Sequence, residues 1–125
     1  MADGANKEAV ASGERAERAL AFLEEMSPDL RGAAILDASG TALAASDKAE
    51  RWGEDAAALL AIADRAGGEP AEQVHIATEQ GEVFAVRHAG LLAVAVTERF
   101  ALASLLFFDM RSILRDLAAQ LEAGG

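Results

Sequence analysis

Three short strand patterns follow one another between residues 73 and 96, and only short turns containing glycine separate them. They cover residues 73–79, 82–87 and 91–96. Connections this short join antiparallel neighbours, because a parallel crossover needs a dozen or more residues. The third pattern is nearly all apolar, so we expect it at the centre of a sheet with both faces covered. This part of the chain must therefore form an antiparallel meander.

The segment before this meander predicts a helix and a hairpin. Apolar residues at three- and four-residue steps indicate a first helix from about residue 13 to Met26, and Pro28 ends it. The stripe consists of Ala16, Ala19, Leu20, Leu23 and Met26. Residues 32–38 and 41–45 predict two strands, joined by a turn in which the side chain of Asp37 bonds the following backbone.

Two further helices are predicted on either side of the meander. One covers residues 54–66 and ends at Gly67, and the other covers 98–122, with Thr97 as its N-cap. The order α-β-β-α-β-β-β-α predicts an α+β fold, a five-stranded antiparallel sheet with helices on both faces. A chain of 125 residues fits a single domain over 12–122, with a frayed N-terminus (1–11) and a flexible tail (123–125).

Composition excludes several function classes. A net charge of -10 disfavours binding to nucleic acid or to anionic membrane surfaces. The chain has no Cys and two His, so we expect no disulfide, metal or cofactor. It has no targeting signal and no apolar run long enough to insert into a membrane, which predicts a cytoplasmic protein. Nine Arg against two Lys, together with 31 Ala, indicate a GC-rich bacterial genome.

The sequence carries no catalytic pattern, so we predict no enzyme and no catalytic residue. Neither a Gly-Lys-Ser/Thr phosphate loop nor a Gly-x-Gly-x-x-Gly turn is present. His75 and His88 lie near neighbouring strands, but no third ligand accompanies them. Ser39 and Ser46 lie beside turns without the pattern of a nucleophile elbow.

The last helix has an apolar seam with four- and three-residue spacing: Ala103, Phe107, Met110, Leu114, Leu117 and Leu121. Leu105, Leu106 and Phe108 extend the apolar surface around its first half. One interpretation buries this half between the sheet and another helix, and the other makes it a partner-binding face. Trp52, the one Trp, either anchors the second helix or belongs to an interface.

Three stretches, taken in their order and spacing, resemble the Roadblock/dynein-light-chain family. They are GAAILDASGTALAAS at 32–46, GEVFAV at 81–86 and LLAVAVTERFALASLLFFDMR at 91–111, and the resemblance covers about residues 14–122. It implies a profilin-like fold and a non-enzymatic homodimeric platform that takes no cofactor. For a bacterial member it implies a regulator or scaffold of a small Ras-like GTPase.

The resemblance also implies how two copies pair, with their sheets joined edge to edge and their second helices side by side. The strand at 73–79 fits this role, because it has one sequence-adjacent partner and no Lys, Pro or Gly to blunt its free edge. The predicted interface is Ala57, Leu60, Ala61, Asp64, Val74, His75, Ile76, Ala77 and Thr78, and the candidate partner-binding residues are Trp52, Leu105 and Phe108. The alternative is a sensor domain of the PAS or GAF type, which binds a small ligand in a cavity.

Overall fold

The computed structural model describes residues 2–39, 41–46, 72–77, 79, 81–98 and 102–124, with side chains from residue 12 to 123. Its elements are α1 (Ala2–Met26), β1 (Leu30–Leu36), β2 (Ala42–Ala45), β3 (Gln73–Ala77), β4 (Glu82–His88), β5 (Leu91–Thr97) and α3 (Ala103–Gly124). The helix predicted over 54–66 lies outside the described residues.

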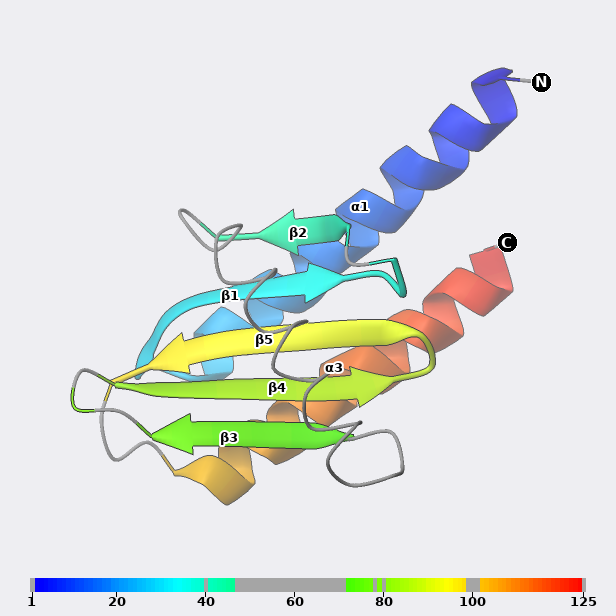
Figure 1. Cartoon of the computed structure of the whole chain (residues 1–125). Coiled ribbons are helices and arrows are strands. Elements are labelled where there is room, and N and C mark those ends of the chain that lie inside the picture. Colours follow the sequence, from blue (N-terminus) through cyan, green and yellow to red (C-terminus); the bar gives the residue numbers. More distant parts are fainter. Residues whose placement is uncertain are drawn as a thin grey trace.

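All five strands form one antiparallel sheet in the order β2-β1-β5-β4-β3 (Figure 1). The uniformly apolar strand β5 is therefore central, as its sequence predicts. Its side chains alternate between two buried clusters: Leu91, Ala93 and Ala95 belong to one, and Leu92 and Val94 to the other. The α+β fold and its five-stranded antiparallel sheet are thus confirmed.

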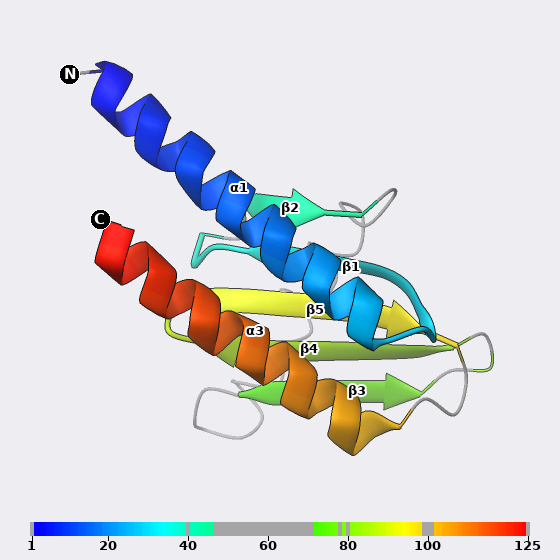
Figure 2. The same cartoon turned by 180° about the vertical axis from the view of Figure 1, so that it is seen from behind.

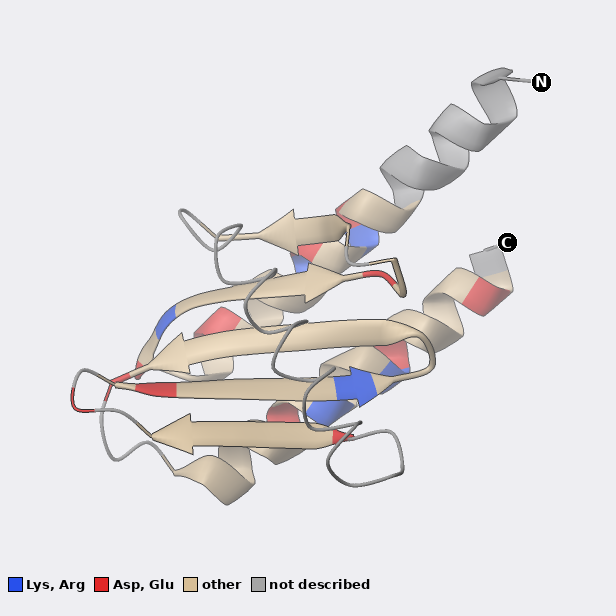
Figure 3. Cartoon of the chain, in the orientation of Figure 1, with Lys and Arg blue, Asp and Glu red and all other residues tan. Residues whose placement is uncertain are grey.

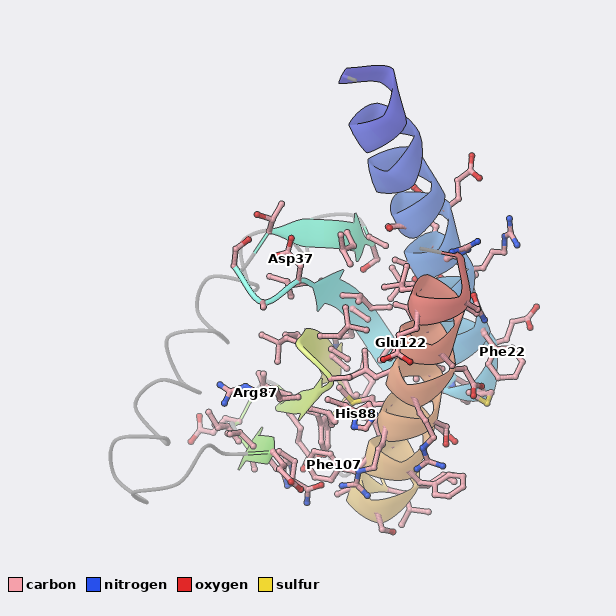
Figure 4. All side chains as sticks on the ribbon, turned by 90° about the vertical axis from the view of Figure 1, so that its right-hand side faces the viewer. Phe22, Asp37, Arg87, His88, Phe107 and Glu122 are labelled. Carbon is pink, nitrogen blue, oxygen red and sulfur yellow. The ribbon has the colours of Figure 1, made fainter. Side chains whose placement is uncertain are left out.

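Helices α1 and α3 cover the same face of the sheet and run side by side (Figure 2). The predicted seams of both helices face inward, since every member is buried or packs against the first cluster. The fully buried side chains at its centre include Leu23, Ile35, Phe84, Met110 and Leu114. Phe107 lies on the side of α3 that faces the sheet, whereas Phe22 lies on the outer side of the helical layer (Figure 4).

The predicted start of the first helix was wrong, because α1 begins at Ala2 and not near residue 13. The expectation rested on the lack of an apolar stripe before residue 13. Residues 2–12 are nevertheless rich in Ala and include Lys and Glu, all strong helix formers. Intrinsic propensity therefore accounts for the helix before the apolar stripe.

The predicted start of the last helix was also wrong, because α3 begins at Ala103 and not at Glu98. Thr97 is the last residue of β5 and pairs with both Leu30 of β1 and Glu82 of β4. Its hydroxyl donates to the carbonyl of Glu98 (2.9 Å) and so does not cap a helix. Pairing on both sides keeps this threonine in the sheet.

Candidate interaction surfaces

Strand β3 forms one edge of the sheet, and β4 is its only strand neighbour among the described residues. The backbone N–H of Arg87 donates to the carbonyl of Glu72 (2.7 Å) just before β3 begins. Antiparallel partners alternate between hydrogen-bonded and non-bonded pairs. The backbone groups of Gln73, His75 and Ala77 therefore point away from β4, toward the open edge.

The side chains of β3 alternate between the two faces of the sheet. Val74 packs against the second apolar cluster. Ile76 lies on the same face of the strand and is also half-buried. Ala77 is exposed, as expected for a position outside the core. His75 faces the helices: its ring stacks on Phe84 with centroids 4.3 Å apart, and Phe107 meets both rings edge-on.

His75 is also tied to β4 through a polar contact. Its Nε2 lies 2.9 Å from Oε1 of Glu82, a largely buried carboxylate at the start of β4. The sequence indicates that His75 and His88 could meet across the hairpin, but the register separates them. His75 pairs with Phe84, so His88 lies four residues further along β4, or about 13 Å.

The hydroxyl and carboxylate residues near the first hairpin have structural roles. Asp37 Oδ1 accepts hydrogen bonds from the backbone N–H of Ser39 (2.9 Å) and Thr41 (3.0 Å), which shapes the turn as predicted. Ser46 Oγ accepts from the N–H of Ala33 (2.9 Å) and lies 3.2 Å from that residue's carbonyl. Ser46 thus fastens the end of β2 to β1, a role its position beside a turn did not reveal.

An ion pair that the sequence analysis missed joins β1 to the residue that follows β5. Arg31 Nε donates to Glu98 Oε1 (2.7 Å), and a second guanidinium nitrogen bonds the other carboxylate oxygen. This hydrogen-bonded contact lowers the pKa of Glu98 and raises the pKa of Arg31. The two residues are 67 positions apart, so no local pattern could have paired them.

The first half of α3 exposes large apolar side chains. Leu105 is 50% exposed and Phe108 is 64% exposed, whereas Leu106 between them is buried. The interpretation that buries this whole half is therefore wrong for both exposed residues. Leu102, which the sequence analysis did not single out, is 66% exposed one turn before Leu105. These three residues form the α3 apolar surface.

A groove of about 70 Å³ lies beside this surface, between the C-terminal end of α1 and the start of α3. Leu102, Leu105 and Leu106 form its apolar wall. Asp109 also lines it, although this residue is only 8% exposed. Within the described part of the chain, the Asp109 carboxylate forms no hydrogen bond or ion pair. Sequence alone indicated no role for Asp109.

The remaining predicted interface residues, Ala57, Leu60, Ala61, Asp64 and Thr78, lie outside the described residues, as does Trp52. Charged residues on the described strands lie toward the strand ends, at Arg31, Glu82 and Arg87 (Figure 3). Over the ranges that the structure describes, no three His, Asp or Glu side chains are grouped to hold a metal ion. No helix there combines the length and apolarity that crossing a membrane requires.

Comparison with known proteins shows which solved structures share this architecture. A scan of the sequence against protein-family models gives no match, and a search of the curated proteins gives none. Among solved structures, the chain is similar to a Roadblock/LC7 domain from Streptomyces avermitilis. The TM-score is 0.76 at 19% identity, over 85% of this chain and 97% of that one.

Two further solved structures have a similar fold. The gliding protein MglB from Thermus thermophilus matches with a TM-score of 0.68 at 21% identity, over 90% of this chain and 93% of that one. Profilin IB from Acanthamoeba castellanii matches with a TM-score of 0.55 at 19% identity, over 74% of this chain and 88% of that one. The fold is therefore profilin-like, and more particularly it is the fold of Roadblock/LC7 domains.

Proposed function

We propose that the chain is a non-enzymatic, homodimeric regulator or scaffold for a small Ras-like GTPase in the bacterial cytoplasm. The observation that carries the proposal is the Roadblock fold with the open edge of β3. At these identities, the structural similarity supports the fold alone. The GTPase role comes from the family resemblance of residues 32–46, 81–86 and 91–111.

Dimer formation follows from the chemistry of the β3 edge. Gln73, His75 and Ala77 each direct a backbone donor and acceptor outward, and an unpaired strand edge readily pairs with another strand. A second copy can pair with it by two-fold symmetry, which joins two five-stranded sheets into one of ten strands. We expect the interface, with the second helices included, to bury about 800 Å² per chain.

The dimer is tested by proline substitution at the two sheet edges. Ala77→Pro removes an N–H that points away from β4, so the strand keeps its own ladder while the proposed dimer contact is lost. Ala42→Pro is the matched control: Asp37 N–H bonds the carbonyl of Thr41 (2.9 Å), so the N–H of Ala42 points outward at the other edge. Sedimentation equilibrium should show a dimer for wild type and the control, and a monomer for Ala77→Pro.

Two results would contradict edge pairing. One is a wild-type chain that stays monomeric at tens of micromolar. The other is a folded Ala77→Pro variant that dimerises as tightly as the control. Ala77→Lys gives a second readout that does not depend on proline, because a charged side chain at the exposed end of β3 also disfavours strand addition.

The GTPase role is tested by isolating the partner and measuring its chemistry. Tagged protein should co-purify with a Ras-like GTPase, identified by mass spectrometry. Addition of the chain should then change the rate of GTP hydrolysis by the purified GTPase, or the chain should change the location of the GTPase in the cell. The chain alone should neither bind nor hydrolyse GTP. Micromolar GTP binding by the isolated chain, or a stoichiometric small ligand as a sensor would hold, would overturn the proposal.

The acidity of the chain predicts the charge of the partner's contact surface. At a net charge of -10, complementary recognition requires a neutral or basic surface on the partner. Leu105, Phe108 and Trp52 remain the candidate contacts for it. Electrostatic attraction acts mainly on the association rate, which should fall as salt is added. An association rate that rises with salt would contradict this.

A further inference from the structure

The groove beside the α3 apolar surface contains a carboxylate that the fold does not use. Asp109 is 8% exposed, and no described residue bonds to its carboxylate. Its unpartnered oxygens must keep some solvent contact, since no fully enclosed polar atom lacks a partner among the described side chains. Burying a carboxylate without a partner costs free energy. A cation bound beside Asp109 would offset this cost.

The surroundings of Asp109 define the chemistry of a ligand. The wall formed by Leu102, Leu105 and Leu106 is apolar, and Asp29 adds a second acidic residue to the lining. A volume of about 70 Å³ exceeds the space of a single water molecule and suits the end of one long side chain. Arginine and lysine have such side chains, with an apolar stem and a cationic head.

The exposed residues on α3 extend the groove into a longer apolar surface. Leu102 comes directly before α3, and Leu105 and Phe108 follow at three-residue steps on the helix; each is at least half exposed. Large apolar side chains that cluster on a surface mark interaction sites. The surface and the groove share Leu102 and Leu105, so one ligand can contact both.

We propose that this groove binds a polypeptide segment that places an arginine or lysine against Asp109 and apolar side chains on Leu102, Leu105 and Phe108. The site lies on the helical layer and not on the β3 edge, so it would function whether or not the chain dimerises. Leu105 and Phe108 are also the candidate contacts for the GTPase, but the peptide site does not rest on that role, because it is argued from Asp109 and the groove. A charged carboxylate in an apolar wall selects a cation over a neutral side chain.

The experiment uses a displayed library of random peptides of about 12 residues, selected on immobilised wild-type protein. Peptides that bind should be enriched in Arg or Lys flanked by apolar residues. A selected peptide is then synthesised with a fluorophore, and its affinity is measured by anisotropy. Asp109→Asn should weaken binding about tenfold or more, as expected when one partner of a buried charge pair is removed. Leu105→Ser should weaken it as well.

The matched control is Asp116→Asn, which removes the same charge from an exposed position two turns further along α3. It should leave the affinity within about twofold of wild type, since exposed pairs contribute little. The proposal is overturned if no basic, apolar peptide is selected, if Asp109→Asn binds as wild type does, or if both variants weaken binding equally.

A stability measurement separates a binding role from a structural one. If Asp109 is unpartnered in the free protein, Asp109→Asn should melt at or above the wild-type temperature while it binds the peptide more weakly. Such an opposition between stability and binding is typical of functional sites. A large drop in melting temperature for Asp109→Asn would show that the carboxylate supports the fold, and would overturn the proposal.

Discussion

The imidazole of His75 stacks flat on the phenyl ring of Phe84, with ring centroids 4.3 Å apart and an interplanar angle of 9°. The two residues are direct cross-strand partners on β3 and β4. Through Phe84, which is fully buried, the edge strand is anchored to the core beneath α3. The edge proposed to pair with a second copy is thus held in place by an aromatic contact and does not depend on backbone bonds alone.

His75→Ala should destabilise the fold, because it removes both the ring stack and the hydrogen bond to Glu82. Aromatic pairs and single hydrogen bonds each contribute about 1 kcal/mol, so we expect a loss of about 1 to 2 kcal/mol. Urea denaturation monitored by circular dichroism measures it. His88→Ala is the control at an exposed histidine and should change stability by less than about 0.5 kcal/mol. Equal losses for the two variants would contradict this account.

Adjacent leucines on α3 should respond in different degrees to truncation. Leu106 is buried in the first cluster, so Leu106→Ala should cost about 2 to 5 kcal/mol through lost burial and a new cavity. Leu105 is half exposed, so Leu105→Ala should cost far less. Denaturation curves of both variants check this difference. A Leu105→Ala variant as unstable as Leu106→Ala would mean that this half of α3 is covered.

Sequence reasoning recovered the parts of this fold that depend on periodicity. The stripes of α1 and α3 and the apolar run of β5 each determined which residues face the core, because burial requires a repeat that matches the helix or strand. The short turns between β3, β4 and β5 required antiparallel pairing. Element ends were less predictable: the start of α1 depends on intrinsic propensity, and Thr97 remains in β5 because two neighbouring strands pair with it.

The candidate sites were only partly predictable, for a physical reason. Exposure of Leu105 and Phe108 depends on how α3 is rotated about its axis against the sheet. Because the apolar surface of this half of the helix is broad, the sequence does not determine that rotation. The groove that Asp109 lines and the Arg31–Glu98 ion pair are both formed by residues far apart in sequence. Local sequence patterns do not indicate contacts between residues that are far apart in the chain. The edge position of β3, by contrast, followed from its place at the start of the meander.

The ion pair between Arg31 and Glu98 should make a small, pH-dependent contribution to stability. The pKa of Glu98 is lowered in the folded state, so the pair contributes above the ordinary value of 4.5 and is lost as pH falls through the lowered pKa. Glu98→Gln should therefore melt below wild type at neutral pH and match it in strong acid. Both residues are exposed, so added salt should shrink the difference. Melting curves that differ equally at every pH would contradict this.

Two glycines should respond in opposite ways to replacement by alanine. Gly81 lies in the turn between β3 and β4, where a Cβ would clash with the carbonyl oxygen of Thr97. Backbone has to move to accommodate it, so Gly81→Ala should cost about 1 to 3 kcal/mol. Gly13 lies inside α1, where a Cβ would meet Leu43 at an ordinary 3.7 Å.

Gly13→Ala should therefore stabilise the protein by about 0.5 to 1 kcal/mol, because alanine is the stronger helix former. The two variants carry the same chemical change, and opposite shifts of the urea midpoint are expected. A shift of the same sign in both would contradict the contrast between the two sites. If Gly81→Ala were neutral, the close approach of the β3–β4 turn to the end of β5 would be excluded. If Gly13→Ala were destabilising, the continuation of α1 before its packed half would be excluded.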